Sequence, residues 1–300
     1  MISTSRRVFL RTSALALATI SADLNLITSG AGVGSSGARR HNPKGIMWDT
    51  IPVKGSIMER MEAVRAAGFD AVEMASHLDQ QEVLKARDET GLKVVSVCGA
   101  KHWAKPLSDP NDRIRAEGLE ALKQTIRDAA AYGATSILLV PGVVNKDVTF
   151  EECSSRSIEQ IKLALPLAKE SGVTISIENV WNNFITTPEQ AVSYLQAINS
   201  PQVGWHFDAG NIIRYGDPIE WIKALGSHLK RVHIKEYSRD LAMRTDDVWK
   251  GFKVSLLHGA NNWSGIMKAL DEVGYTGPLI TEQGGSLEEL SQALDKIMTS

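Results

Sequence analysis

Residues 151–180, EECSSRSIEQIKLALPLAKESGVTISIENV, contain one complete unit of the pattern that decides the fold. Apolar side chains recur every three or four positions from Glu151 to Ser171, which is typical of an amphipathic helix. Gly172 then supplies the left-handed residue that commonly ends a helix. The run Thr174–Val180 is apolar and rich in β-branched residues, which is typical of a buried parallel strand. The stretch therefore predicts a helix, a tight turn and a strand in direct succession.

The same alternation continues through the chain from His41 onward and predicts further strands of this kind. They are expected at Gly45–Ile51, Ala71–Ser76, Lys93–Gly99, Ser136–Gly142, Thr174–Val180, Val203–Asn211, Leu229–Tyr237 and Gly277–Gln283. Helical patterns lie between them, as at Ile57–Ala67, Asp112–Tyr132 and Ser264–Val273. A doubly wound open sheet would carry a glycine-rich phosphate loop after its first strand, and the sequence has none there. We therefore predict a single-domain (β/α)8 TIM barrel over residues 41–300.

Composition excludes several classes of function. The chain of 300 residues is 43% hydrophobic and 23% charged, which is ordinary for a globular protein. Its formal net charge is −2, and no block of Lys and Arg follows the N-terminus, so we expect no nucleic-acid partner. Cys98 and Cys153 are too few for a disulfide framework and are expected to be free thiols, although one bridge stays open.

The N-terminal sequence predicts an export signal. The run Ser5-Arg6-Arg7-Val8-Phe9-Leu10 resembles the twin-arginine export consensus and precedes a modest apolar segment and many small residues. Polar residues interrupt the apolar segment, which is too short and too polar for a membrane span. We expect residues 1–38 to be a cleavable signal peptide and linker, and the protein to be periplasmic or otherwise exported. A disordered basic tail is the alternative.

Four consecutive predicted strands end in an acid or a histidine: Glu178, Asp208, His233 and Glu282. The C-terminal ends of barrel strands meet at one face, where TIM barrels carry their chemistry. Burying ionised carboxylates is costly unless a cation compensates. One divalent ion would compensate all of them, and this ligand set favours Mn²⁺, Mg²⁺ or Co²⁺, with Zn²⁺ as a further candidate. The alternative is separate surface ion pairs and a core histidine.

At these residues the chain resembles the xylose-isomerase-like sugar isomerase/epimerase superfamily. The resemblance runs from Gly45 to Gln283, and its strongest stretches are Ile177–Asn183, Phe207–Asn211 and His233–Glu236. It implies that Glu178, Asp208, His233 and Glu282 bind the metal, with Glu178 and Glu282 also acting as the acid/base pair. It implies a sugar substrate and allows a homo-oligomer.

Further residues are candidates for substrate binding. The resemblance assigns substrate contact to Arg239, six residues after His233, and places the loop of His258 near the substrate. His206 shares the strand face of Asp208, so it contacts a substrate hydroxyl or is a buried donor. His102 follows the third strand and either lines the mouth or is a solvated loop residue. Glu73 ends the second strand, where substrate contact and structural pairing are both open.

The remaining candidates are an amide and three tryptophans. Asn211 stands where relatives usually carry a histidine, and Phe184 stands where some ketose 3-epimerases carry a second glutamate. Trp48, Trp103 and Trp181 fall near strand ends and could form an apolar wall for a sugar face or pack in the core. These differences lie around the substrate and leave its identity open.

We predict a metal-dependent isomerase or epimerase that acts on an α-hydroxy ketone or keto-sugar through an enediolate. A dehydratase on the same site is the first alternative, and a non-catalytic exported metal- or sugar-binding protein is the second. A nuclease would need more metal-binding histidines and a basic face, which the chain lacks. Export favours unphosphorylated sugars, because sugar phosphates are mainly cytoplasmic.

Overall fold

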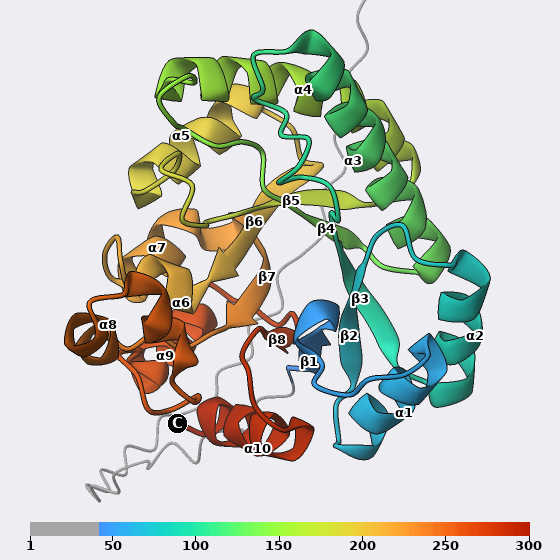
Figure 1. Cartoon of the computed structure of the whole chain (residues 1–300), viewed down its shortest axis with the longest axis vertical. Helices are drawn as coiled ribbons and strands as arrows, with labels where there is room; N and C mark the ends of the chain where they lie inside the picture. Colours follow the sequence, from blue (N-terminus) through green and yellow to red (C-terminus); the bar gives the residue numbers. More distant parts are fainter. Residues whose placement is uncertain (1–41) are drawn as a thin grey trace, which may run out of the picture. The chain divides into compact units, whose positions relative to one another are not determined.

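Eight parallel strands close into a barrel in the order β1 to β8, and β8 pairs with β1. The computed structural model describes residues 42–300 (Figure 1). The predicted signal peptide and linker, residues 1–38, lie outside these residues. The prediction of a (β/α)8 barrel is confirmed. Within residues 42–300, no helix has both the length and the apolar character needed to cross a bilayer.

The strands are β1 Lys44–Met47, β2 Ala71–Ala75, β3 Lys93–Cys98, β4 Ser136–Leu139, β5 Thr174–Glu178, β6 Val203–Asp208, β7 Leu229–Ile234 and β8 Leu279–Thr281. The α-helices are α1 Ile57–Ala66, α2 Gln80–Thr90, α3 Asp112–Tyr132, α4 Phe150–Glu170, α5 Pro188–Ile198, α6 Ala209–Ile212, α7 Pro218–Leu225, α8 Arg239–Thr245, α9 Trp263–Glu272 and α10 Leu287–Met298. Short 3-10 helices are η1 Trp48–Thr50, η2 Gly226–His228 and η3 Val248–Lys253.

Local sequence signals set the ends of the helices. Thr149 and Glu152 form a reciprocal capping box at the start of α4, in which each side chain bonds to the backbone of the other. At the other end of the unit, Gly172 has a φ of 64°, a conformation that costs glycine little and other residues more. Gly133 ends α3 in the same left-handed region, with a φ of 78°. These glycines turn the chain from helix to strand where the sequence predicts it.

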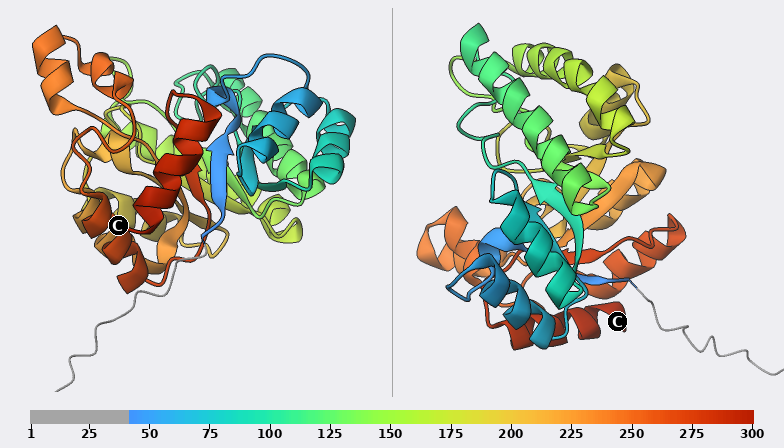
Figure 2. Two further views of the ribbon diagram at one scale, coloured as in Figure 1. Left: turned by 90° about the horizontal axis from the view of Figure 1, so that it is seen from below. Right: turned by 90° about the vertical axis from the view of Figure 1, so that its right-hand side faces the viewer.

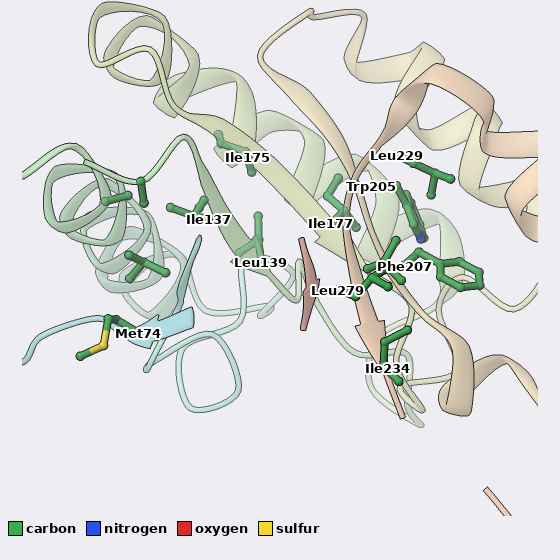
Figure 3. Packing of buried hydrophobic residues seen from close by; sticks show 14 of the residues in the cluster. Met74, Ile137, Leu139, Ile175, Ile177, Trp205, Phe207, Leu229, Ile234 and Leu279 are labelled. Carbon is green, nitrogen blue, oxygen red and sulfur yellow. The ribbon is translucent and has the colours of Figure 1, made fainter. Parts of the chain in front are cut away.

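Alternate strand residues divide the core into two parts. Ile175 and Ile177 of β5, with Trp205 and Phe207 of β6, belong to the main apolar cluster (Figure 3). The residues between them face the other way, because successive strand side chains point to opposite faces. There Ser136 and Ser176 hydrogen-bond across 2.7 Å. The same alternation brings Glu178, His206 and Asp208 to the inner face.

Several strands are shorter than the sequence predicts. β1 ends at Met47 instead of Ile51, β4 at Leu139 instead of Gly142 and β8 at Thr281 instead of Gln283. In β6 the ladder stops at Asp208, and the residues expected to continue it form α6. After β4 the apolar run extends past the strand because Val140, Pro141 and Gly142 stay buried where the ladder has ended. Glu282 is thus the first residue after its strand.

Candidate active site

The structure brings together the four residues predicted to bind a metal. Glu178 and Asp208 end β5 and β6, His233 lies near the end of β7, and Glu282 directly follows β8. Nδ1 of His233 lies 3.0 Å from Glu282 Oε2, 3.3 Å from Glu178 Oε1 and 3.8 Å from Asp208 Oδ2. One ligand atom from each residue lies within 4.8 Å of all the others. The register supports this convergence, because Asp208 is paired with His233 across β6 and β7.

The donor atoms of this cluster fit a divalent cation. Asp208 Oδ2, His233 Nδ1 and Glu282 Oε2 are buried and have no hydrogen-bond partner among the described residues. Such orphaned polar atoms are rare in folded proteins unless water, an ion or a ligand satisfies them. Three carboxylates and one imidazole are hard to borderline donors, so the set suits a divalent ion. Glu178 and Glu282 are the more open members, since the Glu282 side chain is 20% exposed and those of Asp208 and His233 are fully buried.

Glu73 at the middle of β2 orients the histidine. Its Oε2 lies 2.7 Å from Nε2 of His233, on the far side of the ring from the cluster. We assign a proton to Nε2, which donates to this carboxylate, so that Nδ1 faces the other three acids. A ligating histidine commonly donates its second ring nitrogen to a carboxylate, which fixes the tautomer and raises the basicity of the ligand.

The clustered charges shift pKa values in opposite directions. Burial, joined by the neighbouring carboxylates, raises the pKa of Glu178 to about 7. Burial also acts on Glu282, but the Lys235 ammonium, the His233 ring and the hydrogen bond with Asp208 together outweigh it and hold the pKa of Glu282 well below its usual range. Burial lowers the pKa of His233, yet the surrounding carboxylates, first that of Glu73, raise it well above its usual value.

Two asparagines hold Asp208. The Asn179 side-chain oxygen accepts from the backbone N–H of Asp208 at 3.1 Å, and its amide donates to the carbonyl of Asp208 at 2.9 Å. The backbone N–H of Asn211 donates to Oδ1 of Asp208 at 2.8 Å. The Asn211 amide donates to the Asn179 carbonyl at 3.0 Å. Oδ1 is thereby fixed, and Oδ2 is left to face the cluster.

Comparison with known proteins decides the family. Residues 61–298 match the family model described as a xylose isomerase-like TIM barrel. The chain belongs to this family.

Two of the proteins that this chain is similar to are named as sugar epimerases. L-ribulose-5-phosphate 3-epimerase UlaE from Salmonella paratyphi A is 25% identical over 261 residues, which are 82% of this chain and 89% of that protein. The structure is also similar to the 3-keto-D-glucoside 4-epimerase YcjR from E. coli, with a TM-score of 0.74, 16% identity and coverage of 87% and 100%. A third similar structure is the IOLI protein with a bound zinc atom, with a TM-score of 0.69, 17% identity and coverage of 86% and 96%.

Against this family background, two predicted substrate-binding residues lie beneath the cluster. His206 and Glu73 are both fully buried, and His206 packs edge-on against His233 with ring centroids 4.1 Å apart. Burial and the nearby His233 lower the pKa of His206 to about 3, so its ring is neutral. Their burial and their contacts with His233 fit the alternatives of a buried donor for His206 and a structural pairing for Glu73, and substrate contact by either residue stays a prediction.

Three other predicted residues lie apart from the cluster. The Arg239 side chain is exposed, and its guanidinium donates to the carbonyl of Ile213 at 2.6 Å. His102 accepts from the backbone N–H of Val140 at 3.4 Å, and burial lowers its pKa to about 4. His258 lines a separate cavity of about 220 Å³ against α10. Among the described residues, none of these three forms a hydrogen bond or ion pair with the four clustered residues, so their substrate contacts stay predictions.

The structure also shows buried residues that the site prediction did not include. Glu236 accepts hydrogen bonds from the Trp263 indole at 2.8 Å and from the backbone of Asn261 at 3.1 Å and Leu257 at 3.2 Å. Gln283 accepts from the backbone N–H of Glu236 at 2.9 Å. Gln283 directly follows Glu282, and Glu236 directly follows Lys235, just beyond the end of β7. This position after a strand end is the sequence signal that could have identified them. They fix the loops that frame the site.

Proposed function

We propose that this protein is a divalent-metal-dependent sugar epimerase that acts on an α-hydroxy ketone or keto-sugar. The observation that carries the proposal is the convergence of Glu178 and Glu282 on one buried, orphaned histidine nitrogen. Membership of a family whose named relatives include sugar epimerases supports it. A divalent ion held by Glu178, Asp208, His233 and Glu282 would polarise a bound carbonyl and stabilise enediolate charge.

Glu178 and Glu282 carry out the proton transfers, and Lys235 supports one of them. Glu178 and Glu282 come from β5 and from the residue after β8, so their carboxylates approach the centre from two directions. One removes the proton next to the carbonyl, and the other returns a proton on the opposite side, which inverts the carbon. Lys235 Nζ lies 3.0 Å from Glu282 Oε2 and 3.5 Å from Asp208 Oδ2. It keeps Glu282 ionised, which suits the role of base.

Solvent deuterium exchange tests the acid/base pair. The metal-loaded protein is incubated in D2O with a panel of ketoses, and deuterium next to the carbonyl is followed by NMR. We expect exchange and an epimer in the wild type, and loss of the epimer in Glu178→Gln and Glu282→Gln. Glu288→Gln, on the exposed face of α10, is the matched control. Epimer formation above about a tenth of the wild-type rate, a barrier change of about 1.4 kcal/mol or less, would remove that glutamate from the pair.

The same experiment separates the alternatives. An eliminated product in place of an epimer would indicate a dehydratase. Metal and sugar binding without exchange in any ketose would indicate a binding protein. Elemental analysis of the purified protein beside Glu178→Ala/Asp208→Ala identifies the ion, which we expect near one equivalent in the wild type only.

We further propose that residues 1–38 direct twin-arginine export, on the basis of the sequence around Arg6 and Arg7. A reporter fused after residue 40 should reach the periplasm of a suitable bacterial host. Arg6→Lys/Arg7→Lys should retain it in the cytoplasm. Equal export of the two fusions would contradict the proposal.

A further inference from the structure

Four aromatic side chains form a cluster over the β5 to β7 side of the barrel, and we call it the aromatic wall. Its members are Trp181, Tyr237, Trp249 and Phe252. The Trp181 ring lies 4.9 Å from that of Trp249 and 4.8 Å from that of Phe252, centroid to centroid. Tyr237 lies 4.8 Å from Phe252. The four rings come from the two connections that follow β5 and β7, so they belong to the same end of the barrel as the metal cluster.

The wall is joined directly to the proposed active site. Lys235 Nζ lies 3.0 Å from Glu282 Oε2 and 4.9 Å from the centre of the Phe252 ring. The Trp181 indole N–H donates to the carbonyl of Asn211 at 2.9 Å, next to the segment that holds Asp208. Gln283, the residue after Glu282, donates to the carbonyl of Phe252 at 2.9 Å. The position of the wall is therefore set by the neighbours of the predicted metal ligands.

The outer part of the wall is open to solvent. Trp249 is 60% exposed, whereas Tyr237 is 5% exposed. Tyr237 lies in the loop after β7, and Trp249 lies in the segment from α8 to η3, which rises at the barrel end where the arrow of β1 points (Figure 2, left, orange). A large exposed aromatic residue costs solvation free energy that a bound apolar surface would recover. The surface thus runs from the site outward to one accessible indole face.

Arg214 adds polar donors to this surface. Its side chain is exposed, and its guanidinium carbon lies 4.7 Å from the centre of the Trp181 ring. Within residues 42–300, Arg214 forms no ion pair. Its N–H groups remain available beside the aromatic wall, while the neighbouring Arg239 donates to a backbone carbonyl. A flat apolar face next to unpaired donors suits a sugar ring, which has C–H groups on its faces and hydroxyls on its edge.

We propose that the aromatic wall is a second subsite, which binds a further sugar residue linked to the reacting keto-sugar. The inference rests on the proposed function, and it names the substrate class as a keto-sugar glycoside. The second ring stacks on Trp249, and its hydroxyls accept hydrogen bonds from Arg214. A terminal phosphate fits this surface less well, because a single guanidinium beside three indole and phenyl faces offers few donors for a dianion.

Binding of keto-disaccharides tests the subsite. Affinities of lactulose, turanose and isomaltulose are compared with that of D-fructose by calorimetry on the metal-loaded wild-type protein. We expect at least one keto-disaccharide to bind about tenfold more tightly than fructose, a difference of about 1.4 kcal/mol. If none of the three binds more tightly than fructose, the proposal is overturned.

Variants of the aromatic wall test whether Trp249 causes the tighter binding of keto-disaccharides. Trp249→Ala should remove the tenfold advantage and leave the affinity for fructose unchanged, and Trp249→Phe should keep most of it. Met243→Ala on α8, which removes another exposed apolar side chain (74% exposed), is the matched control. An unchanged advantage in Trp249→Ala would overturn the proposal. The subsite is tested by binding, and the epimerase function is tested by deuterium exchange. A wild-type protein that shows no deuterium exchange but binds a keto-disaccharide more tightly than fructose would count against the epimerase function only. A wild-type protein that shows exchange but binds no keto-disaccharide more tightly than fructose would count against the subsite only.

Discussion

Oε2 of Glu73 lies 2.7 Å from Nε2 of His233, although the two residues are 160 positions apart in the sequence. Both side chains are fully buried, so this contact crosses the barrel interior without solvent. Opposing the effect of burial, the interactions of Glu73 with His206 and with His233, which also hydrogen-bonds to it, keep its pKa below the usual value. An ionised Glu73 can only accept, so His233 must donate from Nε2 and present Nδ1 to the other carboxylates.

We predict that Glu73→Gln weakens metal binding. The glutamine oxygen can still accept from Nε2, so the ring keeps its place, but the negative charge that raises the basicity of the imidazole is gone. Loss of such supporting partners commonly costs about 10- to 100-fold in metal affinity. The measurement is competition with a metal-sensitive dye. Asp128→Asn, a buried carboxyl outside the cluster, is the control. Equal affinity in Glu73→Gln and wild type would show that the tautomer is set by other means.

A second prediction concerns Asn179. Its side-chain oxygen accepts from the Trp205 indole N–H at 3.0 Å as well as from the backbone of Asp208, and all of these groups are buried. Asn179→Ala leaves both donors without a partner, and each unsatisfied buried group costs about 1–3 kcal/mol. We expect the free energy of unfolding to fall by that order in urea titrations, with weaker metal binding. Asn145→Ala, whose side chain makes only an exposed hydrogen bond, should change little.

A third prediction concerns Glu236, whose two oxygens accept from the Trp263 indole and from backbone N–H groups. Glu236→Gln keeps the shape but turns an amide NH2 toward some of these donors. Hydrogen bonds to a charged group contribute about 1.5–3 kcal/mol, so we expect destabilisation of that order. Thermal melts beside the exposed-surface control Glu288→Gln provide the measurement. A melting temperature equal to that of the control would mean that the loop adjusts to the amide.

The sequence predicts those features that depend on local pattern. The helix of residues 151–171 was placed within a residue at each end, because its apolar period, capping residues and following glycine all act locally. The four clustered residues were found because strand ends of a parallel barrel meet at one face, so their convergence follows from the topology alone. The helix α8 is short and has no clear apolar period, and its one buried residue, Ala242, packs with Ile213 and Tyr237 from other parts of the chain.

The sequence does not predict how deep each side chain lies within the barrel. Alternation along β6 shows that His206 and Asp208 share a face, but it does not show which of them opens to the mouth. The answer depends on how far each strand is staggered against its neighbours, and His206 lies one step lower, opposite Arg231. The pairing of Glu73 with His233 likewise depends on the diameter of the closed barrel. The contacts that separate supporting residues from substrate-binding ones are thus set by tertiary geometry.

The last prediction concerns the two cysteines, which are free and buried. Burial raises the pKa of Cys98 well above its usual value, and it raises that of Cys153 to about 11. Because the thiolate is the reactive form, native protein at about pH 8 should react with a disulfide reagent at a small fraction of the rate of an exposed thiol. Since both pKa values lie above this range, raising the pH by a unit should not bring either thiol to full ionisation. In denaturant without reductant, two thiols per chain should react rapidly. In denaturant, Cys98→Ser and Cys153→Ser should each leave one reactive thiol. A thiol that reacts rapidly in the native wild-type protein would contradict the prediction and show that Cys98, at the end of β3, or Cys153, in α4, is accessible to the reagent.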